Sequence, residues 1–128
     1  LNGAPRIYIY DTERGTQKLV TQINNPTFAP RWSPDGKWIL YSMAVAGNTD
    51  IYRISSQGGE SQRLTNTPGI NIGGSYSPDG SKIVFESDRS GSQQVYIMDA
   101  DGSNQRQLPI DIAIDYTYGL DQAVSWGA

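Results

Sequence analysis

The sequence predicts an all-β protein made of repeated four-stranded antiparallel sheets, and three observations support this. A hairpin pattern, aromatic-Ser-Pro-Asp-Gly followed by β-branched and aromatic residues, occurs at residues 32–42 and again at residues 76–86. Tyr8, Tyr52 and Tyr96 lie 44 residues apart in three copies of one strand pattern. The chain also has 14 Gly, 7 Pro and no long apolar periodicity of helical type. A repeat of this length built from short strands is typical of β-propeller blades.

Each hairpin pattern contains the residues that a tight turn requires. An aromatic residue, Trp32 or Tyr76, ends one strand, and the Pro that follows presets φ at the first turn position. Asp-Gly then forms the bend, and β-branched and aromatic residues open the next strand. We therefore interpret Ser-Pro-Asp-Gly as turn chemistry within a scaffold.

The repeat divides the chain, residues 1–128, into parts of one propeller domain. Residues 5–20 supply the third and fourth strands of a partial blade, residues 27–65 form a full blade, and residues 72–108 form a second. About three blades do not close a ring, because propellers typically have four to eight. We expect the chain to be part of a larger, six-bladed propeller or to associate with copies of itself, since an open arc leaves strand edges bare.

The last part of the chain departs from the repeat. Residues 122–126 resemble the first strand of a further blade, but Leu108 to Trp126 takes 18 residues where Leu64 to Tyr76 takes 12. Apolar and acidic residues alternate in the inserted segment, residues 109–120. This pattern predicts an extra edge strand or an ordered loop.

Composition argues against several classes of function. The formal net charge is −3, from 10 basic and 13 acidic side chains, and the scattered basic residues do not favour nucleic-acid binding. No apolar run is long enough to predict a membrane-spanning segment, and the residues that follow Leu1 do not have the basic-then-apolar pattern expected of a leader. The absence of Cys excludes a disulfide framework.

The residue types leave few catalytic options. Without His and Cys, the usual nucleophile-base pairs and zinc sites cannot form, so we expect no catalytic residues, no metal and no cofactor. A carboxylate pair for glycoside hydrolysis is formally possible, but solvated strand ends are the favoured interpretation. Residues 99–104 are similar to the start of a calcium loop, yet Asn104 and Ile110 stand where that loop needs Gly and Glu. The carboxylates considered for a pair are Glu86, Asp50, Asp88 and Asp99.

The loops that lead into each first strand are the more promising surface. Residues 24–30 and 69–74 are expected on one face of the propeller, near its central channel. Phe28 and Ile72 occupy comparable places in these loops and are either buried plugs or anchors for a partner. The repeated aromatic residues could form a stacking platform, but packing between blades is favoured. They are Trp32, Trp38, Tyr41, Tyr52, Tyr76, Phe85 and Tyr96.

Residues 28–36 and 75–108 resemble the propeller repeats of the TolB family. The most specific matches are residues 76–80, 85–91 and 96–99. The resemblance implies a periplasmic, non-enzymatic protein of the Tol-Pal envelope system. It also implies a six-bladed propeller that binds the peptidoglycan-associated lipoprotein and supports outer-membrane integrity and cell division.

Carried over by position, the resemblance implies a partner-binding surface on the loops before the first strands. The same repeat also resembles propellers that control substrate access in prolyl-oligopeptidase-type enzymes, so an accessory propeller of a peptidase or other enzyme is the alternative. The partner-binding residues implied by the TolB resemblance are Pro26, Thr27, Phe28 and Ala29 in one loop and Asn71, Ile72 and Gly73 in the next.

Overall fold

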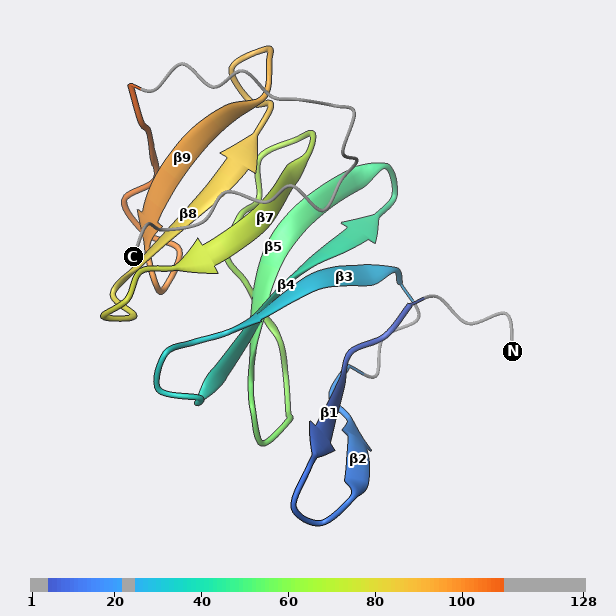
Figure 1. Ribbon diagram of the computed structural model, residues 1–128. Helices are drawn as coiled ribbons and strands as arrows, with labels where there is room; N and C mark the ends of the chain where they lie inside the picture. Colours follow the sequence, from blue (N-terminus) through green and yellow to red (C-terminus); the bar gives the residue numbers. More distant parts are fainter. Residues whose placement is uncertain (1–4, 22–24, 110–128) are drawn as a thin grey trace, which may run out of the picture.

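The computed structural model of the protein, which describes residues 5–21 and 25–109, consists of antiparallel β-sheets packed side by side (Figure 1). Within these residues there are ten strands and no helix, so the predicted all-β class is confirmed. The predicted insertion at residues 109–120, apart from Pro109, and the predicted strand at residues 122–126 lie outside the described residues.

The described strands form one hairpin and two sheets of four strands. β1 (Tyr8–Asp11) pairs with β2 (Thr16–Leu19) in the hairpin. The first four-stranded sheet, here called blade 1, has the order β3-β4-β5-β6, and the second, blade 2, has the order β10-β9-β8-β7. The bounds are β3 Thr27–Trp32, β4 Trp38–Val45, β5 Asn48–Ser55, β6 Gln62–Arg63, β7 Asn71–Tyr76, β8 Lys82–Ser87, β9 Gln94–Asp99 and β10 Arg106–Gln107.

The two Ser-Pro-Asp-Gly turns share the hydrogen bonds made by the Ser hydroxyl. Between β3 and β4, Ser33 Oγ donates to Asp35 Oδ1 over 2.7 Å and accepts the Trp38 backbone N–H over 2.9 Å. Gly36 has φ 72°, in the left-handed region that Gly adopts readily. Between β7 and β8, the equivalent residues make the equivalent bonds. The Ser of the motif is therefore part of the turn, together with Pro, Asp and Gly.

The hydrophobic cores lie between the sheets. One cluster joins the two blades, and Gly74 allows the close approach, because a Cβ there would lie 2.7 Å from Leu40 Cδ2. A second cluster joins the β1–β2 hairpin to blade 1. The first cluster contains Leu40, Ile51, Leu64, Tyr76, Ile83, Phe85, Tyr96 and Met98, and the second contains Ile7, Val20, Ile39, Tyr41, Met43 and Ile54.

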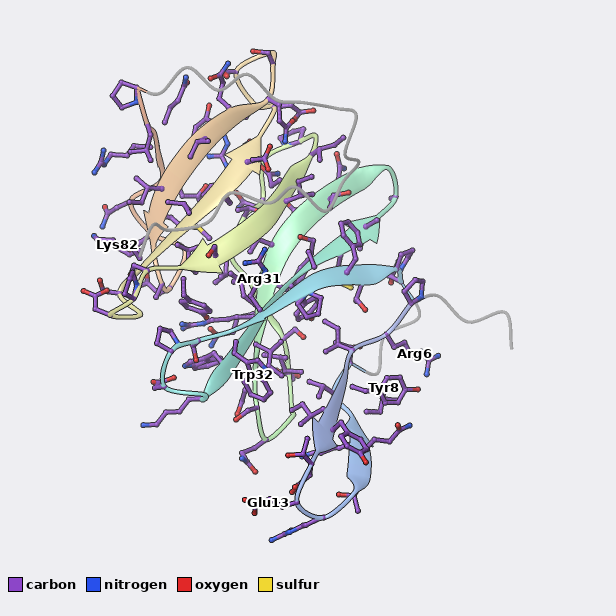
Figure 2. The ribbon with its side chains drawn as sticks, viewed as in Figure 1. Arg6, Tyr8, Glu13, Arg31, Trp32 and Lys82 are labelled. Carbon is purple, nitrogen blue, oxygen red and sulfur yellow. The ribbon has the colours of Figure 1, made fainter. Side chains whose placement is uncertain are left out.

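Burial differs between residues in equivalent places. Tyr76, at the end of β7, is 8% exposed because β7 packs against β3, β4 and β5 of blade 1. Trp32, at the end of β3, is 54% exposed, and Tyr8 on β1 is 53% exposed (Figure 2). The expectation of packing between blades therefore fails for Trp32. On that side of blade 1, the described neighbour is the two-stranded hairpin.

Candidate functional site

Six of the seven residues implied as a partner-binding surface lie in strands, whereas loops were expected. Residues 27–29 are part of β3 and residues 71–73 are part of β7, and Pro26 precedes β3. The cause is strand pairing, because Thr27 pairs with Met43 and Asn71 pairs with Ser87 at the far ends of the neighbouring strands.

The backbone of both first strands bulges within this set. The pairing register shifts between Phe28 and Arg31 in β3 and between Ile72 and Ser75 in β7. Ala29 has φ 55° and Gly73 has φ 70°, so each bulge holds one residue in the left-handed region. Glycine adopts this conformation freely, while alanine is strained in it.

Thr27 and Asn71, which start the two strands, face inward. Thr27 is 2% exposed, and its Oγ1 donates to the Pro5 carbonyl over 2.8 Å. The Asn71 side chain is fully buried. Both are therefore internal supports, and their side chains do not reach the surface. Of the remaining five, Pro26 is exposed, Phe28, Ala29 and Ile72 are half-buried, and Gly73 is buried.

Asn71 belongs to a buried polar cluster that begins with Asp50 of β5. Asp50 is 3% exposed, and its Oδ2 accepts from Arg63 Nη2 over 2.6 Å. Its Oδ1 accepts from Thr65 Oγ1 over 2.7 Å and from Asn71 Nδ2 over 3.1 Å. The hydrogen bond to Asp50 raises the pKa of Arg63. A buried carboxylate paired in this way is a structural anchor, because breaking the pair would leave an uncompensated charge.

The carbonyl oxygen of Asn71 extends the cluster into blade 2. Asn71 Oδ1 accepts from Ser87 Oγ over 2.6 Å and from Arg89 Nη2 over 3.2 Å. The Arg89 guanidinium lies over the Tyr96 ring, 4.6 Å from its centroid, and burial lowers the pKa of Arg89. Asn71 thus links the two blades through hydrogen bonds to Asp50 on one side and to Ser87 and Arg89 on the other.

Two exposed apolar residues beside this cluster were not selected from the sequence. Val45, at the end of β4, is 40% exposed, and Ile70, just before β7, is 43% exposed. The Ala44 N–H donates to the Pro26 carbonyl over 3.1 Å, which brings Pro26 beside the end of β4. Thr49 of β5, next to the partner of Val45, bridges to Ile70. We call Pro26, Val45 and Ile70 the apolar rim.

The position of Val45 at the end of a long strand could have been predicted from the residues that follow it. Ala46 and Gly47 form a two-residue hairpin loop with φ 53° and 84°, typical of a type I′ turn. A turn of this kind lengthens β4 by comparison with β8 and projects Val45 at the end of the sheet. Ile70 lies in the segment predicted as a loop, but no pattern distinguished it from Ile72.

Asp88 and Asp99, two of the carboxylates considered for catalysis, make structural contacts. Asp88 Oδ1 accepts the Ile70 backbone N–H over 2.9 Å, and Asp99 pairs with Lys82. The segment at residues 99–104 is a hydrogen-bonded turn in which Asn104 Nδ2 donates to Asp99 Oδ2 over 2.7 Å. In residues 5–21 and 25–109, no three His, Cys, Asp or Glu side chains are grouped to hold a metal ion. Across the same ranges, no helix has the length and apolar character to span a membrane.

Comparisons with known proteins place the chain among propeller repeats. Residues 1–118 match the family described as TolB beta propeller domain. The Tol-Pal system protein TolB of Gluconobacter oxydans (strain 621H) is 38% identical over 68 residues, which cover 53% of this chain and 15% of that protein. The crystal structure of TolB from Acinetobacter baumannii matches with a TM-score of 0.72 and 36% identity, over 84% of this chain and 27% of that one.

A peptidase has a similar fold at lower identity. Dipeptidyl peptidase 4 of Porphyromonas gingivalis matches with a TM-score of 0.68 and 19% identity, over 88% of this chain and 16% of that one. The chain therefore spans between 15% and 27% of the length of these three proteins.

Proposed function

Because the chain belongs to the TolB beta propeller domain family, we propose that it is a non-enzymatic, protein-binding propeller of the Tol-Pal system. The supporting observation is the apolar rim beside the inter-blade polar cluster. Exposed apolar residues held on a firmly bonded backbone are suited to bind a protein, since little ordering is required on binding. The 38% identity to a Tol-Pal system protein over half of the chain agrees with this assignment.

The partner that we propose is the peptidoglycan-associated lipoprotein. It would contact the apolar rim together with the half-buried side chains of Phe28 and Ile72. Thr27 and Asn71 would support this surface from within, because their side chains are buried. Anchors at the centre of such interfaces are apolar, and charged substitutions there weaken binding.

A binding measurement with matched variants tests this proposal. The soluble part of the lipoprotein is titrated into the wild-type chain, Val45→Asp and Ile70→Asp, and binding is measured by calorimetry. We expect each substitution to weaken binding by at least about tenfold. Trp32→Asp is the control, because Trp32 is exposed at the opposite end of β3. Equal affinity of all four proteins, or no binding by the wild type where an authentic TolB binds, would refute the proposal.

The cellular role follows from the same assignment. We propose a periplasmic location and a contribution to outer-membrane integrity and cell division. The alternative is an accessory propeller that controls access to a peptidase or another enzyme, for which the peptidase match supports the fold alone. Restoration of detergent resistance in cells that lack their own TolB favours the first role, and a hydrolase domain in the same reading frame favours the second.

We also propose that copies of the chain associate through the open edge of β1. Among the described residues, β1 pairs with β2 alone, and Tyr10 on β1 is 61% exposed. An unpaired edge with exposed aromatic residues favours the addition of another strand. Light scattering of the wild type is expected to give at least twice the mass of one chain, and Tyr10→Lys is expected to lower it. A wild-type mass equal to one chain would refute this association.

A further inference from the structure

A pocket of 190 Å³ lies between the two Ser-Pro-Asp-Gly turns, at the opposite end of β3 from the apolar rim. The turns pack against each other, since a Cβ on Gly80 would lie 3.6 Å from Pro34 Cδ. Blade 1 and blade 2 both contribute to its lining, so the pocket exists only where two blades meet.

Two ionised carboxylates stand at the exposed mouth of this turn pocket. Asp35 Oδ1 and Asp79 Oδ1 accept the hydrogen bonds of their own turns. The Ser33 hydroxyl lowers the pKa of Asp35, and the Ser81 backbone N–H lowers that of Asp79 to about 2. All of these hydrogen bonds are made to Oδ1, and none of them involves the Oδ2 atom of either carboxylate. The mouth therefore offers two negative charges and two oxygen acceptors at neutral pH.

The deeper wall of the pocket carries a positive charge. The Arg53 guanidinium lies over the Trp38 ring, 4.1 Å from its centroid, and Arg53 Nε donates to Gln62 Oε1 over 2.7 Å. Tyr76 is 8% exposed, and its hydroxyl lies beside the Arg53 side chain without a hydrogen bond of standard geometry to any described residue. Burial raises the pKa of Tyr76, and the nearby Arg53 charge opposes that shift. A fixed cation with a buried O–H group beside it suits a carboxylate ligand, which could accept from both.

We propose that the turn pocket binds a zwitterion of amino-acid size, with its carboxylate at Arg53 and Tyr76 and its ammonium group between Asp35 and Asp79. A simple amine would meet the Arg53 charge, and a simple carboxylate would meet the two aspartates. A zwitterion satisfies both regions, because each of its charges faces groups of the opposite sign. This site is independent of the proposed lipoprotein surface, which lies at the other end of β3.

Nuclear magnetic resonance titrations of the ¹⁵N-labelled chain test the ligand class. L-alanine carries both charges, ethylamine carries the positive one alone, and propionate carries the negative one alone. We expect L-alanine to give saturable shifts of the Gly36, Gly80 and Trp38 indole N–H signals at millimolar concentrations. The two single-charge probes are expected to bind about tenfold more weakly, the loss typical of one charged hydrogen bond. No saturable shift with L-alanine, or equal binding of all three probes, would overturn the proposal.

Two variants test the residues. Asp35→Asn/Asp79→Asn removes both charges while the amide oxygens still accept the turn hydrogen bonds, and Tyr76→Phe removes only the hydroxyl beside Arg53. Each is expected to weaken L-alanine binding by about tenfold. Asp11→Asn is the control, because Asp11 accepts two backbone N–H groups in the β1–β2 turn outside the pocket. Folding of every variant is checked by its dispersed amide spectrum, and wild-type affinity in both pocket variants would refute the site.

Discussion

Tyr8 on β1 and Tyr96 on β9 occupy the same place in the repeat, yet Tyr8 is 53% exposed and Tyr96 is 6% exposed. Tyr10 is 61% exposed, while its equivalent in blade 2, Met98, is 1% exposed. The local pattern is the same, and each tyrosine lies on a strand that pairs with the next strand along the chain, β1 with β2 and β9 with β10. The difference is that β9 also pairs with β8 on its other side, whereas β1 has no second partner strand among the described residues. The repeat therefore specifies strands and turns, and neighbouring strands and blades determine burial.

The largest expected effect compares the two tyrosines directly. Tyr96 stacks on Phe85 with ring centroids 5.8 Å apart and lies beneath Arg89, so Tyr96→Ala should lower the free energy of unfolding by about 3–5 kcal/mol. Tyr8→Ala should change it by less than ~1 kcal/mol, because more than half of that side chain is exposed. Urea unfolding followed by tryptophan fluorescence measures both. Similar losses in the two variants would mean that Tyr8 is covered in solution.

The second comparison concerns the buried residues that begin β3 and β7. Asn71→Ala should destabilise the chain by ~2–3 kcal/mol, because Asp50, Ser87 and Arg89 each lose a hydrogen-bond partner. Thr27→Ala should cost about 1 kcal/mol, since its hydroxyl donates a single bond to Pro5. Equal losses in urea unfolding would show that Asn71 is not the link between the blades that its contacts indicate.

The third comparison concerns the two bulges. Ala29→Gly should stabilise the chain by roughly 1 kcal/mol, because alanine is strained at φ 55°. Gly73→Ala should destabilise it by about 1–2 kcal/mol, since glycine there adopts φ 70° without strain. Calorimetric melting of the two variants should therefore show shifts of opposite sign, and shifts of the same sign would contradict a shared bulge geometry.

The 44-residue repeat made the fold predictable because turn chemistry and strand patterns are local. Ser77, Pro78, Asp79 and Gly80 carry most of the information needed for their turn. Burial was less predictable, as Trp32 shows, because it depends on which blade covers a strand. The strained φ of Ala29 gave no signal, since an alanine does not indicate a bulge as a glycine does.

The candidate surfaces were predictable only in part. The sequence located the ends of β3 and β7, but Asn71 looked like a loop residue because Asn is common in turns. Its buried contacts with Asp50 and Arg89 join residues far apart in the chain, and no local pattern reveals such a pairing. The same reason hid the turn pocket, which combines Arg53 of blade 1 with Tyr76 of blade 2.

The smallest expected effect concerns how the contributions of Asp35 and Asp79 to folding stability change with pH. Folding lowers the pKa of Asp79 from 3.8 to about 2, so its ionised form stabilises the folded chain above pH ~4, and this contribution is lost as the pH falls from about 4 to about 2. The pKa of Asp35 is also lowered, but Asp35 lacks the third hydrogen bond that the Ser81 hydroxyl gives to Asp79. In urea unfolding between pH 5 and pH 2, Asp79→Asn should therefore lose less stability than the wild type, and Asp35→Asn should show the same trend more weakly. A larger effect in Asp35→Asn would mean that the Ser81 hydroxyl does not distinguish the two turns.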